Sequence, residues 1–395
     1  MAPVPRFEPF RAVRYAPAVD LDRVVAPPYD VLSDADVDAL ATRDPHNIVH
    51  VDVPRGGVDR YTTAARLLRE WVAAGVMVAD AAPTFTLYRM GFTDATGARR
   101  DLVGVLGGLE VVDPGAGGVL PHERTTPKAS TDRLDLTRAT TANLSPVWGL
   151  SLASGLTDLL AEPAEPVGAV SVDGVDHVVE RVTDPNRIDA IRDHLGRDDV
   201  LIADGHHRYA VSQTYRDEVR AATGRTDTAA EQTLAFVGEL VVEQLSIEAI
   251  HRLYAGASFA DVRAELARSF DVTPAEPATA ATLAEMVASG RLVLIGPGGS
   301  AEWLTPKPHV FDDVRALDGA WLEHAMTAST AEVRYQHGLH EVVDEVRTGA
   351  ATAAVLIRPV SIAEIERTAR EGLLMPPKST FFTPKLRTGF VVRDL

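Results

Sequence analysis

Residues 200–208 read Val-Leu-Ile-Ala-Asp-Gly-His-His-Arg, and they indicate a strand that leads directly into a helix. The apolar run 200–203 is typical of a buried strand, and the segment from Tyr209 to Thr223, closed by Gly224, predicts a helix. A helix N-terminus exposes unpaired backbone N–H groups and a positive dipole end, which together favour anions. We therefore expect a phosphate-binding element at residues 204–208.

The side chains of this element suit phosphate chemistry. Gly205 allows a ligand to approach the backbone closely, Arg208 can donate two hydrogen bonds to phosphate oxygens, and His206 and His207 add further donors. Adjacent helical side chains diverge, so the two histidines are poorly placed to chelate one metal ion together. Asp204 is a candidate to cap the helix, to orient a histidine or to hold Mg²⁺ through water. The alternative interpretation is an Asp-Gly turn with surface histidines.

Strands and helices alternate along the chain without a regular βαβ rhythm, which favours an α+β fold with a mixed-sheet core. Hairpins are predicted over 84–112 and around Asp173-Gly174, and residues 24–31 are interpreted as a short strand broken by two prolines. The polar stretch between Pro114 and Pro146 lacks periodicity, and we expect an irregular functional segment there.

The length of 395 residues suits two or three domains. A boundary near 255–259 predicts a catalytic region over 1–255. It also predicts a smaller C-terminal domain of α/β or α+β class over 256–395, which ends in the Lys-Ser-Thr segment.

Composition limits the classes of function. A net charge of −17 with no dense Lys/Arg run repels nucleic acid, so we expect no nucleic-acid partner. No apolar stretch is long enough to cross a membrane and the N-terminus does not resemble a signal peptide, so we expect a cytoplasmic protein with no membrane partner. The absence of cysteine excludes disulfides, thiolate nucleophiles and cysteine-ligated zinc.

A second motif, Pro121-His122-Glu123, lies in the polar stretch. A carboxylate on a constrained loop is a candidate general base, so we expect Glu123 and Asp204 to be the catalytic residues. The surrounding acids and bases suggest a clamp for a zwitterionic substrate, although a salt-bridge network explains them equally. The candidate substrate-binding residues are His122, Lys128, Asp132, Arg133 and Asn143, with Tyr29 and Asp30 from the proline-rich turn.

The C-terminal segment is a third candidate. Lys378, Ser379 and Lys385 stand among prolines and phenylalanines, as in a rigid turn that presents donors to phosphate. The alternative is a proline-stiffened docking segment.

These motifs resemble a known family. The ordered set VVAPPYDV, HNIV, LPHERT with DRLDLTRATTANLSP, ADGHHRYA and MPPKSTFFTPKL resembles the bacterial and archaeal family named domain of unknown function 1015. The Pro-His-Glu and Asp-Gly-His-His-Arg pair is also similar to that of free-serine kinases with the ParB/sulfiredoxin-like fold. That resemblance implies that Glu123 acts on a serine hydroxyl and that residues 204–208 hold donor phosphates. About eighty residues separate the two motifs here, more than in compact members of that fold.

Together the motifs and the resemblance predict a small-molecule kinase. It transfers a phosphoryl group from pyrophosphate or a nucleotide, ATP or ADP, to the hydroxyl of a free amino acid, with L-serine giving O-phosphoserine and Mg²⁺ as cofactor. The expected partners are the amino acid and the donor, and a homodimer is compatible with the sequence. A non-catalytic nucleotide-binding regulatory module and a phosphohydrolase stay open as alternatives.

Overall fold

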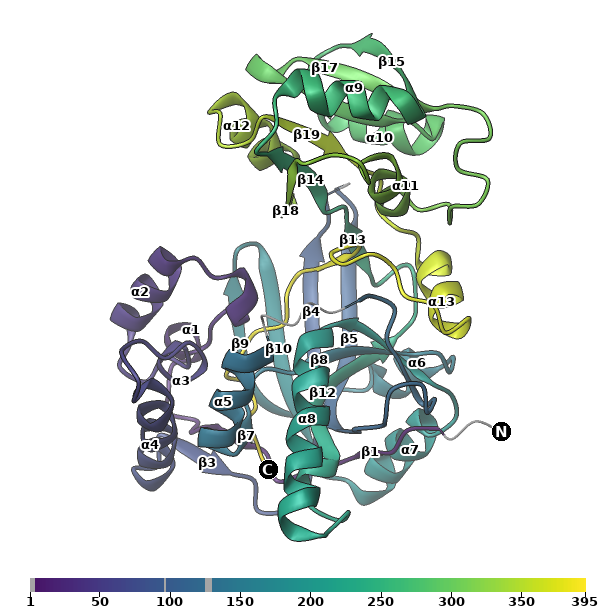
Figure 1. Ribbon diagram of the computed structural model, residues 1–395. Helices are drawn as coiled ribbons and strands as arrows, with labels where there is room; N and C mark the ends of the chain where they lie inside the picture. The colour runs from purple at the N-terminus through teal and green to yellow at the C-terminus, as the bar shows by residue number, and fades with distance from the viewer. Residues whose placement is uncertain (1–3, 96, 125–129) are drawn as a thin grey trace. The chain divides into compact units, whose positions relative to one another are not determined.

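The computed structural model describes residues 4–95, 97–124 and 130–395, and the chain forms two units (Figure 1). The first unit runs to Ser246 and also includes Ala369–Leu373 and Thr383–Leu395. The second comprises Ile247–Thr368 and Leu374–Phe382.

The elements of the first unit are, in chain order, β1 (Phe7–Glu8), β2 (Val13–Tyr15), α1 (Leu21–Val24), η1 (Tyr29–Val31), α2 (Asp34–Arg43), α3 (Val49–Asp52), α4 (Arg60–Ala73), β3 (Met77–Ala79), β4 (Phe85–Thr93), β5 (Arg99–Glu110), β6 (Val119–Leu120), α5 (Ser130–Thr140), β7 (Ala142–Asn143), β8 (Val147–Ser151), α6 (Leu156–Ala161), β9 (Glu165–Val172), β10 (Val175–Val182), α7 (Pro185–Leu195), β11 (Val200–Asp204), α8 (His206–Thr223), η3 (Ala229–Glu231), β12 (Gln232–Glu239) and β21 (Arg393–Asp394).

The elements that follow are β13 (Ser246–Glu248), β14 (His251–Ala255), α9 (Phe259–Ser269), β15 (Phe270–Ala275), α10 (Ala280–Ser289), β16 (Leu292–Ile295), η4 (Pro297–Gly299), β17 (Ala301–Pro306), α11 (Asp318–Ala325), β18 (Glu332–Gln336), α12 (Leu339–Arg347), β19 (Ala353–Leu356), α13 (Ile362–Arg370) and β20 (Phe381–Thr383).

A mixed sheet forms the centre of the first unit, as expected for an α+β fold. Its strand order is β6-β11-β8-β12-β5-β4-β10-β9, with β1 also paired to β5. The pairs β6–β11 and β8–β12 are parallel, whereas the others are antiparallel. Both predicted hairpins, β4–β5 and β9–β10, are present in this sheet.

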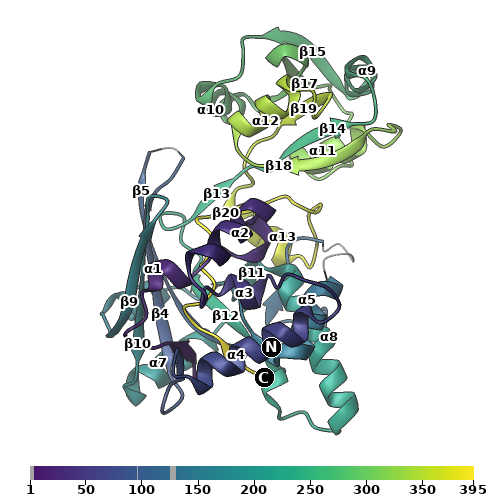
Figure 2. The ribbon, with the colours of Figure 1, turned by 90° about the vertical axis from the view of Figure 1, so that its left-hand side faces the viewer.

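Helices cover the sheet and build two apolar cores. Strands β4, β5 and β12 bury side chains against α6 and α7, where Leu160, Ile191 and Leu195 are inaccessible to solvent. A second core forms around Trp71 of α4 and includes Leu136 of α5. Helix α5 packs against both α4 and α8, and it lies beside α8 in both ribbon views (Figure 1, Figure 2).

Two local predictions are wrong. Residues 24–31 form no continuous strand: α1 ends at Val24, only Ala26 makes a β-bridge, to Thr388, and η1 follows the two prolines. The polar stretch contains helix α5, which we expected to be irregular. Its sequence is too polar to show a clear apolar face, and its packing on α4 and α8 supplies the stabilisation that periodicity does not reveal.

The second unit has its own sheet, with strand order β15-β17-β16-β19-β14-β18. Every pairing described in this sheet is antiparallel, so of the two classes expected for this domain the unit is α+β and not α/β. Its division from the first unit also differs from the boundary at 255/256. Strand β14 lies before residue 256 but pairs within the second sheet, so the second unit begins earlier than predicted. The end of the chain returns to the first unit, where Val392 bonds to Val13 and β21 pairs with β7.

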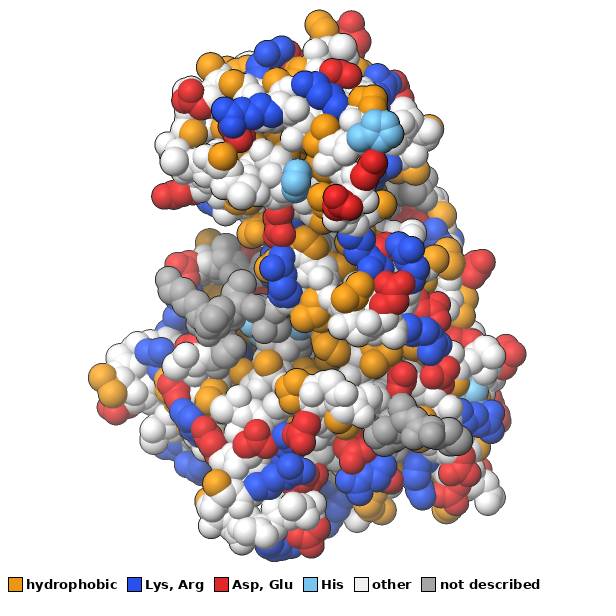
Figure 3. All heavy atoms as spheres, turned by 45° about the vertical axis from the view of Figure 1, so that its right-hand side comes forward, with side chains coloured by type: hydrophobic (Ala, Val, Ile, Leu, Met, Phe, Trp, Pro, Cys, Tyr) orange, Lys and Arg blue, Asp and Glu red, His pale blue; other side chains and the backbone are white. Residues whose placement is uncertain are grey.

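Charged side chains of both signs are interspersed on the face of each unit drawn in Figure 3. Among the helices of the described residues, none combines the length and apolar character needed to cross a bilayer.

We predict that Phe236→Ala destabilises the first unit by about 3–5 kcal/mol, because the ring is fully buried in β12 and packs edge-to-face on Trp148, with centroids 5.7 Å apart. Denaturant unfolding followed by tryptophan fluorescence measures the loss. Val242→Ala, at an exposed position after the same strand, is the control and should change the unfolding free energy by under about 0.5 kcal/mol. Equal losses of unfolding free energy in the two variants would contradict the burial of the Phe236 ring.

Candidate functional site

The structure brings the Pro121–Glu123 loop to the start of helix α8. Strand β6 runs parallel to β11, with Val119 opposite Val200 and Leu120 opposite Leu201. The loop therefore leaves the sheet edge next to the end of β11, where α8 begins. Glu123 in this loop is half-buried.

His122 links the loop to this edge of the sheet through hydrogen bonds. Its ring Nδ1 lies 2.7 Å from the carbonyl oxygen of Ile202, and its backbone N–H donates to Nε2 of His206 at 3.4 Å. The two imidazoles meet edge-to-face with centroids 4.7 Å apart. Because a carbonyl only accepts, Nδ1 of His122 carries the proton.

Both rings are neutral at pH 7. Burial lowers the pKa of His122 to about 4. Burial and the neighbouring His122 ring hold the pKa of His206 well below its usual value. The two histidines therefore contribute hydrogen-bonding groups rather than positive charge.

Asp204 holds two cations beside the helix start. One carboxylate oxygen accepts from Nη2 of Arg208 at 2.6 Å, and the other accepts from Nζ of Lys385 at 2.8 Å. Burial alone would raise the pKa of Asp204, but the charges of Lys385 and Arg208 outweigh it and bring the pKa well below its ordinary value. Asp204 is not the helix cap, because Gly205 occupies that position. Asp204 forms ion pairs with Arg208 and Lys385, and a catalytic role for it stays a prediction.

Gly205 and Arg208 fit together closely. Gly205 adopts φ +88°, and a Cβ atom there would lie 3.0 Å from Nε of Arg208. Arg208 is only 9% exposed, and its Nη1 donates to the carbonyl of Pro146. The guanidinium is thus fixed in place, and its buried Nε–H is a donor without an acceptor among the described residues.

The first turn of α8 adds backbone donors. Tyr209 donates its N–H to the carbonyl of Gly205, so it is the first residue with an intrahelical bond. At a helix start the first backbone N–H groups lack an acceptor within the helix. Together with Arg208 and Lys385 they form a positively polarised corner suited to an anion.

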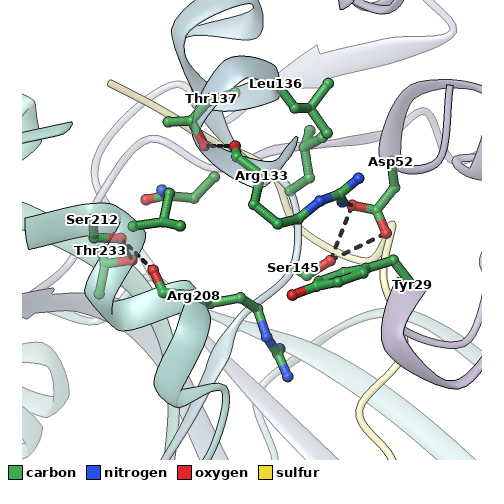
Figure 4. Close-up of a pocket in the computed structure, with 13 residues that line it drawn as sticks. Tyr29, Asp52, Arg133, Leu136, Thr137, Ser145, Arg208, Ser212 and Thr233 are labelled. Carbon is green, nitrogen blue, oxygen red and sulfur yellow. Dashed lines mark hydrogen bonds and ion pairs between the residues drawn. The ribbon is translucent and has the colours of Figure 1, made fainter. Parts of the chain in front are cut away.

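A pocket lies next to Arg208, which is one of its lining residues. Its empty volume is about 430 Å³, which includes open solvent at its mouth. Figure 4 shows Asp52, Arg133, Tyr29 and Ser145 on one side and Arg208 on the other. The pocket is lined by Tyr29, Asp52, Arg133, Leu136, Thr137, Ala142, Asn143, Leu144, Ser145, Arg208, Val211, Ser212 and Thr233.

Three of the predicted substrate-binding residues, Tyr29, Arg133 and Asn143, line this pocket, whereas Asp30 and the buried His122 do not. The guanidinium of Arg133 stacks on the Tyr29 ring, 4.1 Å from its centroid. Burial raises the pKa of Tyr29 to about 12, so its hydroxyl is protonated at pH 7. Asn143 also lines the pocket, but its Oδ1 accepts from the N–H of Leu234 at 2.9 Å, which ties it to β12. Asp30 stands 3.8 Å from Arg208.

Other predicted residues stand elsewhere. Asp132 is half exposed, does not line the pocket, and accepts from Arg133 and from the Tyr61 hydroxyl at 2.6 Å. Lys128 lies outside the described residues. Lys378 and Ser379 belong to the second unit, where the Ser379 hydroxyl donates to the carbonyl of Pro376. A phosphate-binding role for these two stays a prediction.

Sequence reasoning missed Asp52. Asp52 is 2% exposed, and its carboxylate accepts from Nη1 of Arg133 at 3.2 Å and from the Ser145 hydroxyl at 3.3 Å. A signal was present, since Asp52 ends the largely apolar run Ile48-Val49-His50-Val51. The neighbouring Asn47, by contrast, is a structural residue, because its side chain bonds to the backbone of Arg23 and Val49.

The described residues do not fit a dedicated metal centre. No group of three or more His, Asp or Glu side chains within them is arranged to hold a metal ion. At Asp204, the oxygens that could take Mg²⁺ already accept from Arg208 and Lys385. We therefore assign no metal-binding role to Asp204.

Three comparisons with known proteins bear on this chain. A model of the family described as "Protein of unknown function (DUF1015)" matches residues 7–320. No curated protein matches the chain.

Solved structures resemble the chain distantly. A free serine kinase in complex with AMP aligns at 12% identity and TM-score 0.41, over 70% of this chain and 88% of its own. A conserved hypothetical protein from Pyrococcus furiosus aligns at 14% identity and TM-score 0.40, over 70% and 91%. SbnI with a C-terminal truncation, from Staphylococcus aureus, aligns at 13% identity and TM-score 0.40, over 73% and 87%. Likeness at this level supports no inference about activity.

We predict that Gly205→Ala weakens pyrophosphate binding by at least about tenfold, because the new Cβ strains a positive-φ position and pushes the Arg208 guanidinium aside. Isothermal titration calorimetry with pyrophosphate measures the change.

Gly224→Ala is the matched control at the other end of α8. Gly224 also has a positive φ, +68°, but a Cβ there meets no atom within 4 Å. Both variants should lose about 1–2 kcal/mol of stability from backbone strain, and only Gly205→Ala should lose affinity. Equal affinity in both variants would show that the Gly205–Arg208 contact is not part of an anion site.

Proposed function

Because this chain belongs to the DUF1015 family, whose description assigns no activity, we propose its function from the site: it is a small-molecule kinase. In this proposal, the protein transfers a phosphoryl group from pyrophosphate or a nucleotide to the hydroxyl of a free amino acid, and L-serine becomes O-phosphoserine.

The observation that carries the proposal is the proximity of two chemically different elements. The loop that holds Glu123 leaves β6 beside the end of β11, and His122 of that loop bonds to Ile202 and contacts His206. A carboxylate-bearing loop therefore adjoins a helix start that is suited to phosphate. Phosphoryl transfer to an alcohol needs this combination of a base and an anion cradle.

The donor phosphates are proposed to bind at the first turn of α8. Backbone N–H groups of residues 206–208 and the guanidinium of Arg208 donate to the phosphate oxygens. Lys385 adds positive charge near Asp204. These groups stabilise negative charge that shifts onto the leaving group during transfer.

The acceptor is proposed to bind in the pocket next to Arg208, with Tyr29 and Arg133 in its wall, and to extend its hydroxyl toward Glu123, which does not itself line the pocket. Glu123 takes the proton from the serine hydroxyl as the oxygen forms a bond to phosphorus. The bond between that phosphorus and the bridging oxygen breaks, and phosphate leaves when pyrophosphate is the donor. No step is assigned to Mg²⁺, although donor phosphates ordinarily carry it.

The activity is tested directly by incubating the purified protein with L-serine, Mg²⁺ and either pyrophosphate, ADP or ATP. We expect phosphoserine, detected by mass spectrometry, with at least one donor. Release of phosphate without any phosphorylated amino acid would identify a phosphohydrolase instead. Nucleotide binding with no turnover would favour a regulatory module.

We predict that Glu123→Gln lowers kcat by about 10²–10⁴-fold, because it removes a general base while it keeps the size of the side chain. Calorimetry should show nearly unchanged donor affinity. Glu162→Gln, at an exposed position of the same unit, is the control and should retain wild-type kcat. A wild-type kcat in Glu123→Gln would contradict the assignment of the base.

We predict the opposite pattern for Arg208→Ala, because it removes charge-assisted hydrogen bonds to the donor. Donor affinity should fall by about 10–100-fold, which corresponds to about 1.5–3 kcal/mol. Arg208→Lys keeps the charge without the planar fork and should restore only part of the affinity. Unchanged donor binding in Arg208→Ala would place the phosphates elsewhere.

A further inference from the structure

Asp52 is a charged wall residue of the pocket that the proposed transfer does not use. It ends α3, and its side chain is almost entirely inaccessible to solvent. A carboxylate in such a position is costly unless cations or hydrogen-bond donors surround it. Its surroundings therefore indicate whether the group is saturated by the protein or can accept from a ligand.

The protein saturates one oxygen of Asp52 better than the other. Oδ1 accepts from Arg133 at 3.2 Å and from the Ser145 hydroxyl at 3.3 Å. Oδ2 has only a 3.4 Å contact with that same hydroxyl among the described residues. Ser145 also shares a hydrogen bond with the Thr388 hydroxyl at 2.9 Å. Oδ2 thus has capacity for a strong donor.

The cation beside Asp52 is held from several sides. Arg133 places Nη1 on Asp52 and directs Nε and Nη2 to Asp132, while its plane stacks on Tyr29. The pocket therefore presents a fixed carboxylate and a fixed guanidinium next to each other, and Figure 4 shows Arg208 across from them. Adjacent opposite charges match a small zwitterion, in which an ammonium and a carboxylate are attached to one carbon.

We propose that Asp52 recognises the α-ammonium group of the acceptor, so that it selects amino acids over hydroxy acids of the same shape. The ammonium donates to Oδ2 of Asp52, and Arg133 supplies the neighbouring positive charge for the α-carboxylate. This inference rests on the proposed function, since it assigns the acceptor to the same pocket.

Burial raises the pKa of Asp52, while the nearby Arg133 and Arg208 oppose that effect. A bound ammonium adds a further positive charge and stabilises the ionised carboxylate. This is the behaviour expected of a group whose counter-charge arrives with a ligand.

The test compares L-serine with L-glycerate, in which a hydroxyl replaces the ammonium group. Calorimetry on the wild-type protein should show at least tenfold tighter binding of L-serine. In Asp52→Asn the ratio of the affinity for L-serine to that for L-glycerate should fall by about tenfold or more, chiefly because L-serine binds more weakly. An unchanged ratio in Asp52→Asn would overturn the inference.

Asp80→Asn is the matched control. Asp80 is also buried and pairs with an arginine, Arg14, at 2.9 Å, but it does not line the pocket. It should lose stability in the same way as Asp52→Asn and keep the wild-type ratio of the two affinities. A fall of the ratio in both variants would show a general structural effect and would also overturn the inference.

Two outcomes keep this inference separate from the proposed function. Serine binding that depends on Asp52, without phosphoserine from any donor, would remove the kinase and leave the zwitterion site standing. Phosphoserine formation with an unchanged ratio in Asp52→Asn would do the reverse. If Asp52→Asn does not fold, the wild-type ratio decides, because equal binding of serine and glycerate contradicts ammonium recognition.

Discussion

A buried hydrogen bond joins the two chain segments that form the candidate site. The imidazole of His122, kept neutral by burial, lies 2.7 Å from the carbonyl oxygen of Ile202 and joins the end of β6 to the end of β11. About eighty residues lie between the two strands in sequence, so chain connectivity does not bring Glu123 to α8. The parallel β6–β11 pairing and this hydrogen bond do so, and both lie at the sheet edge where the helix begins.

The charge of the protein imposes a second constraint. With a net charge of −17, an anionic ligand gains little attraction at long range, so an anion site must rely on short-range donors. The structure provides these at α8: Arg208 is held by Asp204 and by the Pro146 carbonyl, and Gly205 leaves it room. Lys385 reaches Asp204 from the last segment of the chain, which returns to the first unit.

Local sequence patterns predicted the strand and helix of the candidate site, but features that depend on contacts between residues distant in sequence were not predicted. The apolar run at 200–203 and the Gly205 corner led to β11 and α8 because strand, turn and helix follow one another directly. Helix α5 was missed because its stability comes from packing on α4 and α8. Asp52 was missed because its significance depends on Arg133, eighty-one positions away. Asn143 was predicted to bind substrate, yet its Oδ1 accepts a hydrogen bond from the backbone N–H of Leu234.

A crystal structure of the protein with pyrophosphate and L-serine would show whether Glu123 and the start of α8 face the same bound substrates. We expect phosphate oxygens within hydrogen-bond distance of the backbone N–H groups at the start of α8, and the Glu123 carboxylate beside the serine hydroxyl. Pyrophosphate bound away from α8, or a Glu123 side chain that faces away from the acceptor, would contradict this expectation.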